Sequence, residues 1–322
     1  MRAAVIKEFG APYVLRLDEA PDPPLGAGEV LIDVELANVT FVETQIRAGR
    51  PPNPAMLPTL PAILGNGVGG TVAAAGPGAA PSWAGRRVVT GLTGTGGYAE
   101  RAVAAVQRLI EVPDAMELRD AVALLADGRT AAGVMDSAQI AAGDTVLVEA
   151  AAGGVGTLLV QLARNAGARV VALASQERKL ATARALGADL AIDYSTPDWP
   201  LRVRAVAGEV DVVFDGVGGE IGLAAFGLLR AGGRFCPFGM ASGSFTPLPP
   251  QLASERRVIV VRSGPASPER LRRLTQAALD EAAAGHIRPV IGQEFELSQA
   301  DAAHAAIEAR TTIGKTLLTV PR

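Results

Sequence analysis

The stretch from Asp144 to Gly156, DTVLVEAAAGGVG, constrains the fold of this chain more than any other. It begins with a short run of β-branched and apolar residues at 145–148, which is typical of a buried parallel strand. Small residues follow, and residues 155–166 then have the apolar spacing of a helix that stops at Gly167. The order of strand, glycine turn and helix predicts a cradle for a phosphate group.

The glycines of this stretch suit a dinucleotide. Gly153 lets the backbone approach a pyrophosphate, and Gly156 lets the helix pack closely on the strand. Ala151 stands where the G-x-G-x-x-G pattern has its first glycine, but a second strand at 169–174 supplies the expected context. A plain strand–turn–helix connection is the alternative. The predicted cofactor contacts here are Ala152, Gly153, Gly154, Val155 and Gly156.

The end of the second strand indicates which dinucleotide binds. An NAD site usually has an acidic residue there for the ribose 2′-hydroxyl. This chain has Ser175, followed by Arg178 and Lys179, and no carboxylate ends the strand. A hydroxyl and two cations suit a 2′-phosphate, so we expect NADPH. Alternatively, the two cations are part of a solvated helix start.

Several segments together resemble one family. They are AAAGGVG, the serine and lysine after it, LGADLAIDY at 186–194 and DVVFDGVGG at 211–219. These resemble the zinc-free quinone oxidoreductases of the medium-chain dehydrogenase/reductase superfamily, over nearly the whole chain. The resemblance implies an α/β protein with a doubly wound parallel (Rossmann) sheet domain and a GroES-like β-barrel domain. It also implies hydride transfer from NADPH without zinc.

Length and charge agree with a two-domain enzyme. The chain has 322 residues, which is more than one core usually serves. The net charge of −3 gives no reason to expect nucleic acid as a partner, and no long apolar run predicts a membrane span. We therefore expect a soluble, cytoplasmic protein. The GroES-like domain is expected over residues 1–122 and 263–322, and the Rossmann domain over 123–262.

Cysteine and histidine are too few for a zinc site of the alcohol dehydrogenase type. The chain has one cysteine, Cys236, and two histidines, His286 and His304. Cys236 lies in GGRFCPFGM, which predicts a buried strand and a core thiol. Both histidines are expected at the surface or at a boundary, and no metal is expected.

Three residues of the first domain are candidates for orienting the acceptor. Thr40 lies where the resemblance places a small polar residue near the nicotinamide, but its spacing to Glu43 also fits a helix capping box. Gln45 stands where some relatives have tyrosine. Asn66 could offer its amide to a carbonyl, although the acidic residue that relatives have at Gly67 is missing.

Further cofactor contacts follow from the resemblance. Residues 127–131, DGRTA, resemble a turn that brings a threonine to the cofactor, and Thr130 is the candidate, with a helix cap as the alternative. Other candidates follow predicted strand ends or lie in the closing strand at 314–318. They are Tyr194, Val217, Phe238, Gly239, Met240 and Lys315.

Three functions remain open from the sequence. The first is an NADPH-dependent reductase that transfers a hydride to a quinone or another conjugated carbonyl acceptor. The second is an enoyl or alkenal double-bond reductase of the same superfamily, and the third is an NADPH-binding protein with little catalysis. A homodimer is expected through the edge strand VIVVR at 258–262 of the Rossmann domain, because an unpaired apolar edge would associate.

Overall fold

The chain divides into two compact units. The computed structural model describes residues 1–261 and 267–321. One unit comprises residues 1–127 and 289–322, and the other comprises residues 128–288. The first unit therefore runs to Asp127, five residues beyond the boundary expected after residue 122. The expected return to the first domain at 263 lies at Pro289, so the helix at 268–283 belongs to the second unit.

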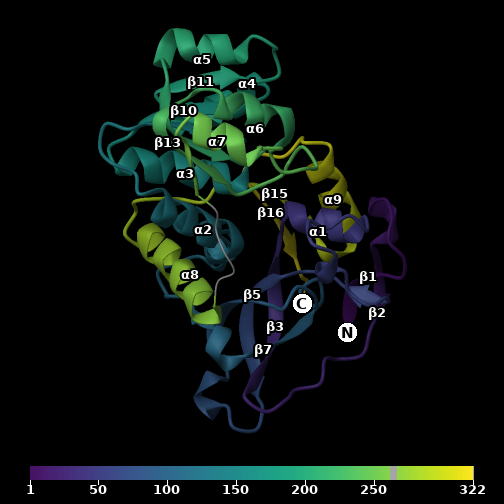
Figure 1. Ribbon diagram of the computed structural model, residues 1–322. Coiled ribbons are helices and arrows are strands. Elements are labelled where there is room, and N and C mark those ends of the chain that lie inside the picture. The colour runs from purple at the N-terminus through teal and green to yellow at the C-terminus, as the bar shows by residue number, and fades with distance from the viewer. Residues whose placement is uncertain (262–266, 322) are drawn as a thin grey trace. The chain divides into compact units, whose positions relative to one another are not determined.

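Contacts within the second unit explain where that helix lies. Helix α8 (Pro268–Ala283) packs beside the second half of α2 (Leu118–Ala138), as Figure 1 shows. Arg270 forms an ion pair with Asp136 at 3.3 Å, and the Leu274 side chain lies against the space beside Gly133. These contacts are between residues far apart in the sequence, which the local pattern of the helix does not reveal.

A six-stranded parallel sheet forms the second unit. Its strand order is β11-β10-β9-β12-β13-β14. The order reverses between β9 and β12, so these two strands mark the switch point where ligands bind in doubly wound sheets. The strands are β9 (Thr145–Val148), β10 (Arg169–Ala174), β11 (Leu190–Asp193), β12 (Val210–Asp215), β13 (Leu229–Pro237) and β14 (Ile259–Val260).

Helices alternate with these strands and bury their apolar runs. Val146, Leu147 and Val148 of β9 have no exposed surface, as expected for a strand covered on both faces. Phe226 and Phe235 meet edge to face in the same core, with ring centroids 5.5 Å apart. The helices are α3 (Gly154–Asn165), α4 (Glu177–Ala185), α5 (Trp199–Ala207), α6 (Gly219–Phe226) and α7 (Pro250–Glu255).

The first unit is built mainly from antiparallel strands. Three strands pair in the order β2-β1-β4, and a larger sheet has the order β15-β16-β3-β5-β6-β8, with β7 also paired to β3. The strands are β1 (Arg2–Ile6), β2 (Arg16–Glu19), β3 (Glu29–Val39), β4 (Ala62–Ile63), β5 (Gly67–Ala75), β6 (Arg87–Gly91), β7 (Arg101–Ala105), β8 (Ile110–Glu111), β15 (Ile291–Glu296) and β16 (Lys315–Thr319).

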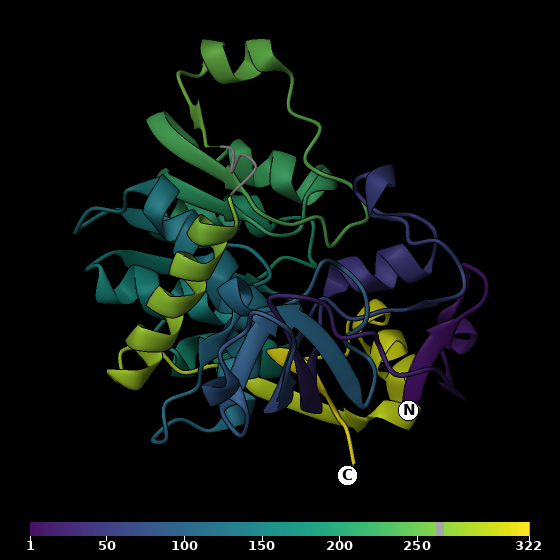
Figure 2. The same ribbon diagram turned by 90° about the horizontal axis from the view of Figure 1, so that it is seen from below.

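The C-terminal segment completes this first unit. Strand β16 pairs with β3, and α9 (Ala300–Glu308) packs against α1 (Phe41–Arg47), as both ribbon views show (Figures 1 and 2). Residues from the start and the end of the chain thus share one core. In residues 1–261 and 267–321, no helix combines the length and the apolar character needed to cross a membrane.

Candidate functional site

The glycine turn after β9 has the geometry of a phosphate-binding loop. Ala150 has a left-handed backbone with a φ of 47°, and the Gly153 N–H donates to the Ala150 carbonyl at 2.8 Å. A Cβ on Gly156 would lie 2.2 Å from that same carbonyl oxygen. Glycine is therefore required at Gly156 for α3 to start this close to the strand. The free N–H groups at the start of α3 suit an anion, so the loop fits a dinucleotide pyrophosphate.

The end of β10 has the character expected for a 2′-phosphate. Ser175 follows the strand, and Gln176 adopts a positive φ of 72° before α4 begins. The Arg178 Nε–H donates to the Gln176 side chain at 3.2 Å. Glu177, which is the first carboxylate after the strand in the sequence, is ion-paired with Arg184 at 2.5 Å. Its negative charge is therefore partly neutralised, which reduces its repulsion of a phosphate.

The loops after β12 and β13 pack closely together at the same edge of the sheet. A Cβ on Gly239 would lie 2.6 Å from the Gly216 carbonyl oxygen, and the Phe238 ring covers Gly216. Val217 is buried, with 1% of its surface exposed, and its N–H donates to the Glu149 carboxyl. Tyr194 and Met240 are partly exposed after β11 and β13. The predicted residues at these strand ends thus lie on one edge, and their contacts with a cofactor stay predictions.

Sequence reasoning missed two acidic residues at the switch point. Glu149 follows β9, Asp215 ends β12, and both are fully buried. The Glu149 carboxyl accepts the Val217 N–H at 3.1 Å, and Asp215 accepts the Gly218 N–H at 2.7 Å and the Thr246 hydroxyl at 2.5 Å. Burial and then the charge of Asp215 raise the pKa of Glu149 well above its usual value. The glutamate within VEAAAGG was the available signal.

In the first unit, Thr40 and Asn66 lie together. Thr40 is the N-cap residue of α1, and the Asn66 amide Nδ2 lies 3.4 Å from the Thr40 hydroxyl oxygen. The Glu43 carboxyl joins them, because it accepts the Thr40 N–H and hydroxyl at 2.7 and 2.9 Å and the Asn66 N–H at 2.7 Å. The capping spacing seen in the sequence is thus present, and Glu43 does more than cap the helix.

Tyr98 and His304 extend this group and were not predicted as site residues. The Tyr98 hydroxyl lies 3.1 Å from the Glu43 carboxyl and 3.1 Å from His304 Nε2. His304 is fully buried, so the expectation that it lies at a surface or boundary was wrong. Burial and the nearby charge of Arg47 lower its pKa to about 3. The pattern of α9 gave no signal, because the residues that cover His304 come from the start of the chain.

Gln45 is placed differently from Thr40 and Asn66. Its side chain is mostly buried, and its amide Nε2 donates to the Thr44 hydroxyl at 3.1 Å. Among the hydrogen bonds found for the described residues, none joins the Gln45 side chain to Thr40 or Asn66. Its role toward an acceptor stays a prediction.

The DGRTA segment is not a turn. Residues 118–138 form the single helix α2, and Thr130 lies within it, neither at a turn nor at a cap. The turn implied by the family resemblance and the alternative of a helix cap are therefore both wrong, because the helix continues through Gly128. Contact of Thr130 with the cofactor stays a prediction.

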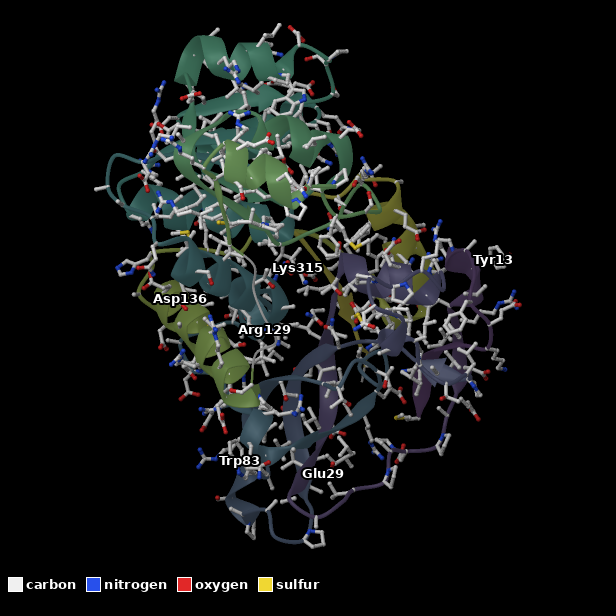
Figure 3. All side chains as sticks on the ribbon, viewed as in Figure 1. Tyr13, Glu29, Trp83, Arg129, Asp136 and Lys315 are labelled. Carbon is white, nitrogen blue, oxygen red and sulfur yellow. The ribbon has the colours of Figure 1, made fainter. Side chains whose placement is uncertain are left out.

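Lys315 on β16 is held by Asp127. Its Nζ lies 3.1 Å from the Asp127 carboxylate, and the two side chains are 3% and 14% exposed. Figure 3 labels Lys315 on its strand. The Lys315 ammonium group is therefore paired with a carboxylate of its own unit. Contact of Lys315 with a cofactor stays a prediction.

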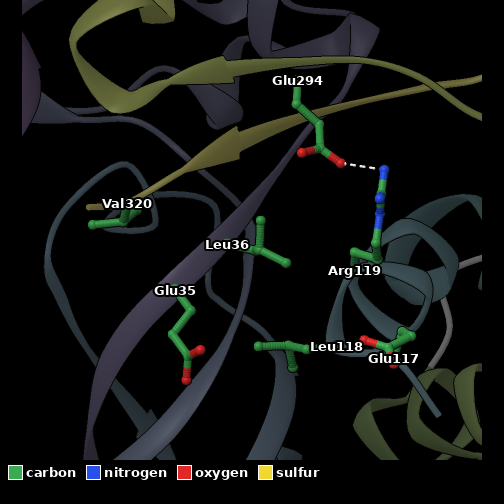
Figure 4. Close-up of a pocket in the computed structure, with 7 residues that line it drawn as sticks. All are labelled: Glu35, Leu36, Glu117, Leu118, Arg119, Glu294 and Val320. Atoms are coloured by element: carbon green, nitrogen blue, oxygen red, sulfur yellow. Dashed lines mark ion pairs between the residues drawn. The ribbon is translucent and has the colours of Figure 1, made fainter. Parts of the chain in front are cut away.

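A cavity of about 370 Å³ lies elsewhere in the first unit. Figure 4 shows its lining, which includes the Arg119–Glu294 ion pair at 2.5 Å together with Glu35, Leu36 and Val320. None of the predicted site residues lines it. Glu35 in this cavity accepts the Thr71 hydroxyl at 3.0 Å, so its carboxylate is engaged in the sheet.

The side chains that could bind a metal ion are dispersed over the part of the chain that the structure describes. Across residues 1–261 and 267–321, no three or more histidine, cysteine, aspartate or glutamate side chains gather in a way that could hold a metal ion. The Cys236 thiol is 2% exposed in β13, as a core position predicts.

The chain matches two family descriptions and resembles known proteins over nearly its full length. Residues 26–114 match the alcohol dehydrogenase GroES-like domain, and residues 154–280 match the zinc-binding dehydrogenase family. A 2-haloacrylate reductase of a Burkholderia species is 32% identical, covering 98% of both chains. A quinone oxidoreductase of Pseudomonas aeruginosa is 30% identical, covering 96% of this chain and 97% of its own.

A solved structure gives the same result for the fold. The crystal structure of an Escherichia coli quinone oxidoreductase complexed with NADPH has a TM-score of 0.91 to this chain. It is 27% identical, and the match covers 99% of this chain and all of that one. The predicted fold class, a doubly wound α/β domain with a GroES-like domain, is therefore confirmed.

Proposed function

The chain belongs to the quinone oxidoreductases of the medium-chain dehydrogenase/reductase superfamily, and we propose that it reduces a quinone or another conjugated carbonyl compound with NADPH. The observation that carries the proposal is the close approach of α3 to β9 at Gly156, beside the switch point of the sheet. This approach forms the phosphate cradle that a dinucleotide-dependent reductase requires.

NADPH, when bound, supplies the hydride. The loop from Ala152 to Gly156 holds its pyrophosphate through backbone N–H groups, and Ser175, Arg178 and Lys179 hold the 2′-phosphate. Arg178 is exposed, so its long side chain can reach a phosphate at the edge of the sheet.

Thr40, Asn66 and Gln45 orient the acceptor in this proposal. Thr40 and Asn66 carry polar groups, they are partly exposed, and Glu43 fixes both of their backbones. Hydrogen bonds from such groups suit an acceptor whose developing charge moves onto an oxygen. Quinones and α,β-unsaturated carbonyl compounds have that property, whereas simple ketones stabilise the charge less.

A specific observation favours the second candidate, a reductase of activated double bonds. The similarity to the 2-haloacrylate reductase is as extensive as that to the quinone oxidoreductases. The two functions use the same cofactor and the same kind of charge stabilisation, and they differ in the acceptor. An NADPH-binding protein with little catalysis is the remaining alternative.

Oxidation of reduced nicotinamide against a panel of acceptors tests the function. The panel contains a benzoquinone, a naphthoquinone, an enone, an alkenal, an enoyl thioester and 2-chloroacrylate, with NADPH and NADH in parallel. Turnover of the quinones with NADPH supports the first candidate, and turnover restricted to double-bond acceptors supports the second. Thermal stabilisation by NADPH with no turnover of any acceptor would leave only a binding protein.

Replacing both cations after β10 tests the cofactor preference. The Arg178→Ala/Lys179→Ala variant should raise the KM for NADPH by about 10-fold or more, because each charge-assisted hydrogen bond contributes about 1.5–3 kcal/mol. The KM for NADH should change little. Arg169→Ala is the matched control, because Arg169 begins the same strand at its opposite end and its guanidinium donates to the Val206 carbonyl. Equal losses with both cofactors would contradict the proposal.

The dimer and the cytoplasmic location stay predictions. Strand β14 is the edge of the parallel sheet, and Ile259 on it is 57% exposed. Arg262, the last residue of the predicted edge strand, lies outside the described residues. Light scattering of the protein and of Ile259→Lys tests the dimer, since a charge on a shared edge should yield monomers. A monomeric parent protein at micromolar concentration would contradict it.

A further inference from the structure

The Glu43 carboxyl group is the centre of a buried hydrogen-bond network in the first unit. It receives the N–H groups of Thr40 and Asn66 and the hydroxyl groups of Thr40 and Tyr98, at distances between 2.7 and 3.1 Å. The Glu43 residue is 1% exposed. A helix cap needs one such bond and usually lies in solvent, so capping alone does not account for this arrangement.

The protonation of Glu43 decides what Thr40 can do. A hydroxyl group has only one hydrogen to donate. When Glu43 is ionised, the Thr40 hydroxyl donates that hydrogen to the carboxylate and can only accept from a ligand. When Glu43 is protonated, the acid donates to the Thr40 oxygen at 2.9 Å, and the Thr40 hydrogen is released toward a ligand. Burial raises the pKa of Glu43 and so favours this protonated form.

His304 fixes the direction of the Tyr98 hydrogen bond. His304 is neutral at physiological pH, since burial lowers its pKa to about 3. Its Nδ1 has no hydrogen-bond partner among the described residues. A buried N–H without a partner is less favourable than a buried lone pair, so the proton belongs on Nε2. His304 therefore donates to the Tyr98 oxygen, and Tyr98 donates to Glu43.

We propose that Glu43 is the proton source for the reduced acceptor and delivers its proton through the Thr40 hydroxyl group. This inference rests on the proposed reductase function. Thr40 is the catalytic residue, because it touches the acceptor, whereas Tyr98 and His304 are positioning residues. None of these groups was a candidate general acid from the sequence, since Glu43 fitted a capping pattern there.

The proton balance of the step is complete. Hydride addition to a conjugated acceptor leaves a negative charge on its carbonyl oxygen. The Thr40 O–H bond breaks as the new O–H bond forms on the acceptor, and Thr40 takes the proton of Glu43. The resulting Glu43 carboxylate is stabilised by Tyr98 and by the two backbone N–H groups. Water then reprotonates Glu43 through the partly exposed Thr40 hydroxyl.

Lys315 is the cation whose charge acts on Glu43. Its positive charge lowers the pKa of Glu43, opposing the effect of burial, and so stabilises the carboxylate that the step produces. Asp127 pairs with Lys315 and partly offsets that charge. Tyr98 remains protonated throughout, because burial and then the charge of Glu43 raise its pKa well above the usual value.

Arg47 is a further charged group, and its charge acts on His304. Arg47 on α1 is 1% exposed and forms an ion pair with Glu308 on α9. Its charge lowers the pKa of His304 and keeps the imidazole neutral. Glu43 is therefore the only group of this network that changes charge in the step.

The test compares Glu43→Gln with the parent protein on two acceptors, an enone and a benzoquinone. Glutamine keeps the size of the side chain, but its single oxygen can accept only one of the two backbone N–H groups, and it has no acidic proton to release. The enolate from an enone must be protonated to give the product, whereas the anion of a reduced benzoquinone is a stable phenolate that can leave the site and take its proton from water. Glu35→Gln is the matched control, because Glu35 lies in the same unit, outside this network, and is hydrogen-bonded to Thr71.

Glu43→Gln should lower kcat for the enone by about 100-fold or more, as expected for a lost general acid. The benzoquinone kcat should fall by less than about 3-fold, and the decline of enone kcat at high pH should disappear. Tyr98→Phe should move the loss of enone activity to higher pH, because one hydrogen-bond donor to the Glu43 carboxylate is then missing and the pKa of Glu43 rises. Equal losses on both acceptors, or an unchanged enone kcat, would overturn the proposal.

Infrared titration of the protein without cofactor supplies a readout that does not depend on turnover. Protonated carboxyl stretches should persist above the usual range of glutamate titration, and Glu149 contributes to them as well. The Glu43 band is therefore the part of this signal that is lost in Glu43→Gln and kept in Glu35→Gln. Failure of the parent protein to reduce any acceptor would overturn the reductase function while leaving this band in place. Absence of the band at neutral pH would overturn the proton-donor role even if turnover is observed.

Discussion

Glu149 and Asp215 are two fully buried carboxyl groups at the ends of neighbouring parallel strands, one on each side of the switch point. Burial first, and then the negative charge of Asp215, raise the pKa of Glu149. The folded protein therefore binds this proton more tightly than the unfolded chain does. The Val217 N–H donates to Glu149, which connects this carboxyl pair to the DGVGG loop.

The Glu149–Asp215 pair predicts a stability that falls as pH rises. Glu149 contributes its full stabilisation below its unfolded pKa, near 4.5, and loses it as pH rises toward the folded pKa. The slope is about 1.4 kcal/mol per pH unit in that window. Urea unfolding of Glu149→Gln between about pH 5 and pH 9 should show a flatter profile. Glu177→Gln, whose carboxylate is exposed, should keep the parent profile.

Alanine substitutions at Gly156 and Gly153 test how closely the phosphate loop is packed, because the two sites differ in the space for a methyl group. Gly156→Ala places a methyl group 2.2 Å from the Ala150 oxygen, which forces α3 away from the strand. We expect about 1–3 kcal/mol of destabilisation, as for other overpacked sites, and a Kd for NADPH raised by about 10-fold or more. Gly153→Ala places its methyl 3.2 Å from the same oxygen and should have a smaller effect on both. Fluorescence titration with NADPH measures the difference, and equal Kd values for the two variants would contradict this account.

Removing one partner of the buried Lys315–Asp127 ion pair should lower the free energy of unfolding. Lys315→Met leaves the Asp127 carboxylate without its 3.1 Å partner, and we expect a loss of about 3 kcal/mol. The double variant Lys315→Met/Asp127→Leu should recover part of that loss, because no unpaired charge remains. Urea unfolding of both single variants and the double variant measures the coupling. Additive losses would show that the pair is not coupled.

The same lysine should also shift the pH profile of enone reduction. Its positive charge lowers the pKa of Glu43, so Lys315→Met should raise that pKa and extend the activity to higher pH. The pH dependence of kcat measures this, with Glu35→Gln as the control. A profile moved to lower pH would contradict the electrostatic assignment.

Cys236 should be unreactive in the folded protein. The thiol is 2% exposed, and burial raises its pKa to about 12, so almost no thiolate exists near neutral pH. Labelling with a disulfide reagent at about pH 8 should be slow in buffer and stoichiometric in urea. Rapid labelling of the folded protein would show that β13 opens or that the thiol is accessible.

The order of elements in the second unit was predictable because its signals are local. β9 and β10 have the residue bounds predicted for them, and the glycine turn before α3 appears in the sequence as a strand–glycine–helix pattern. Such runs are decided by neighbouring residues and by burial on both faces of a parallel sheet. The phosphate loop could therefore be located before any contact was known.

The sequence by itself determined the cofactor loop, the fold class and the pairing of Thr40 with Glu43, since each depends on residues close in the chain. Only the tertiary structure decided the burial of His304 and the network of Tyr98, Glu43 and Asn66, because these residues come from distant segments. The pKa values of buried groups depend on the charges and hydrogen-bond donors that folding brings around them. Chemistry at such groups is therefore a property of the packed chain rather than of any local pattern.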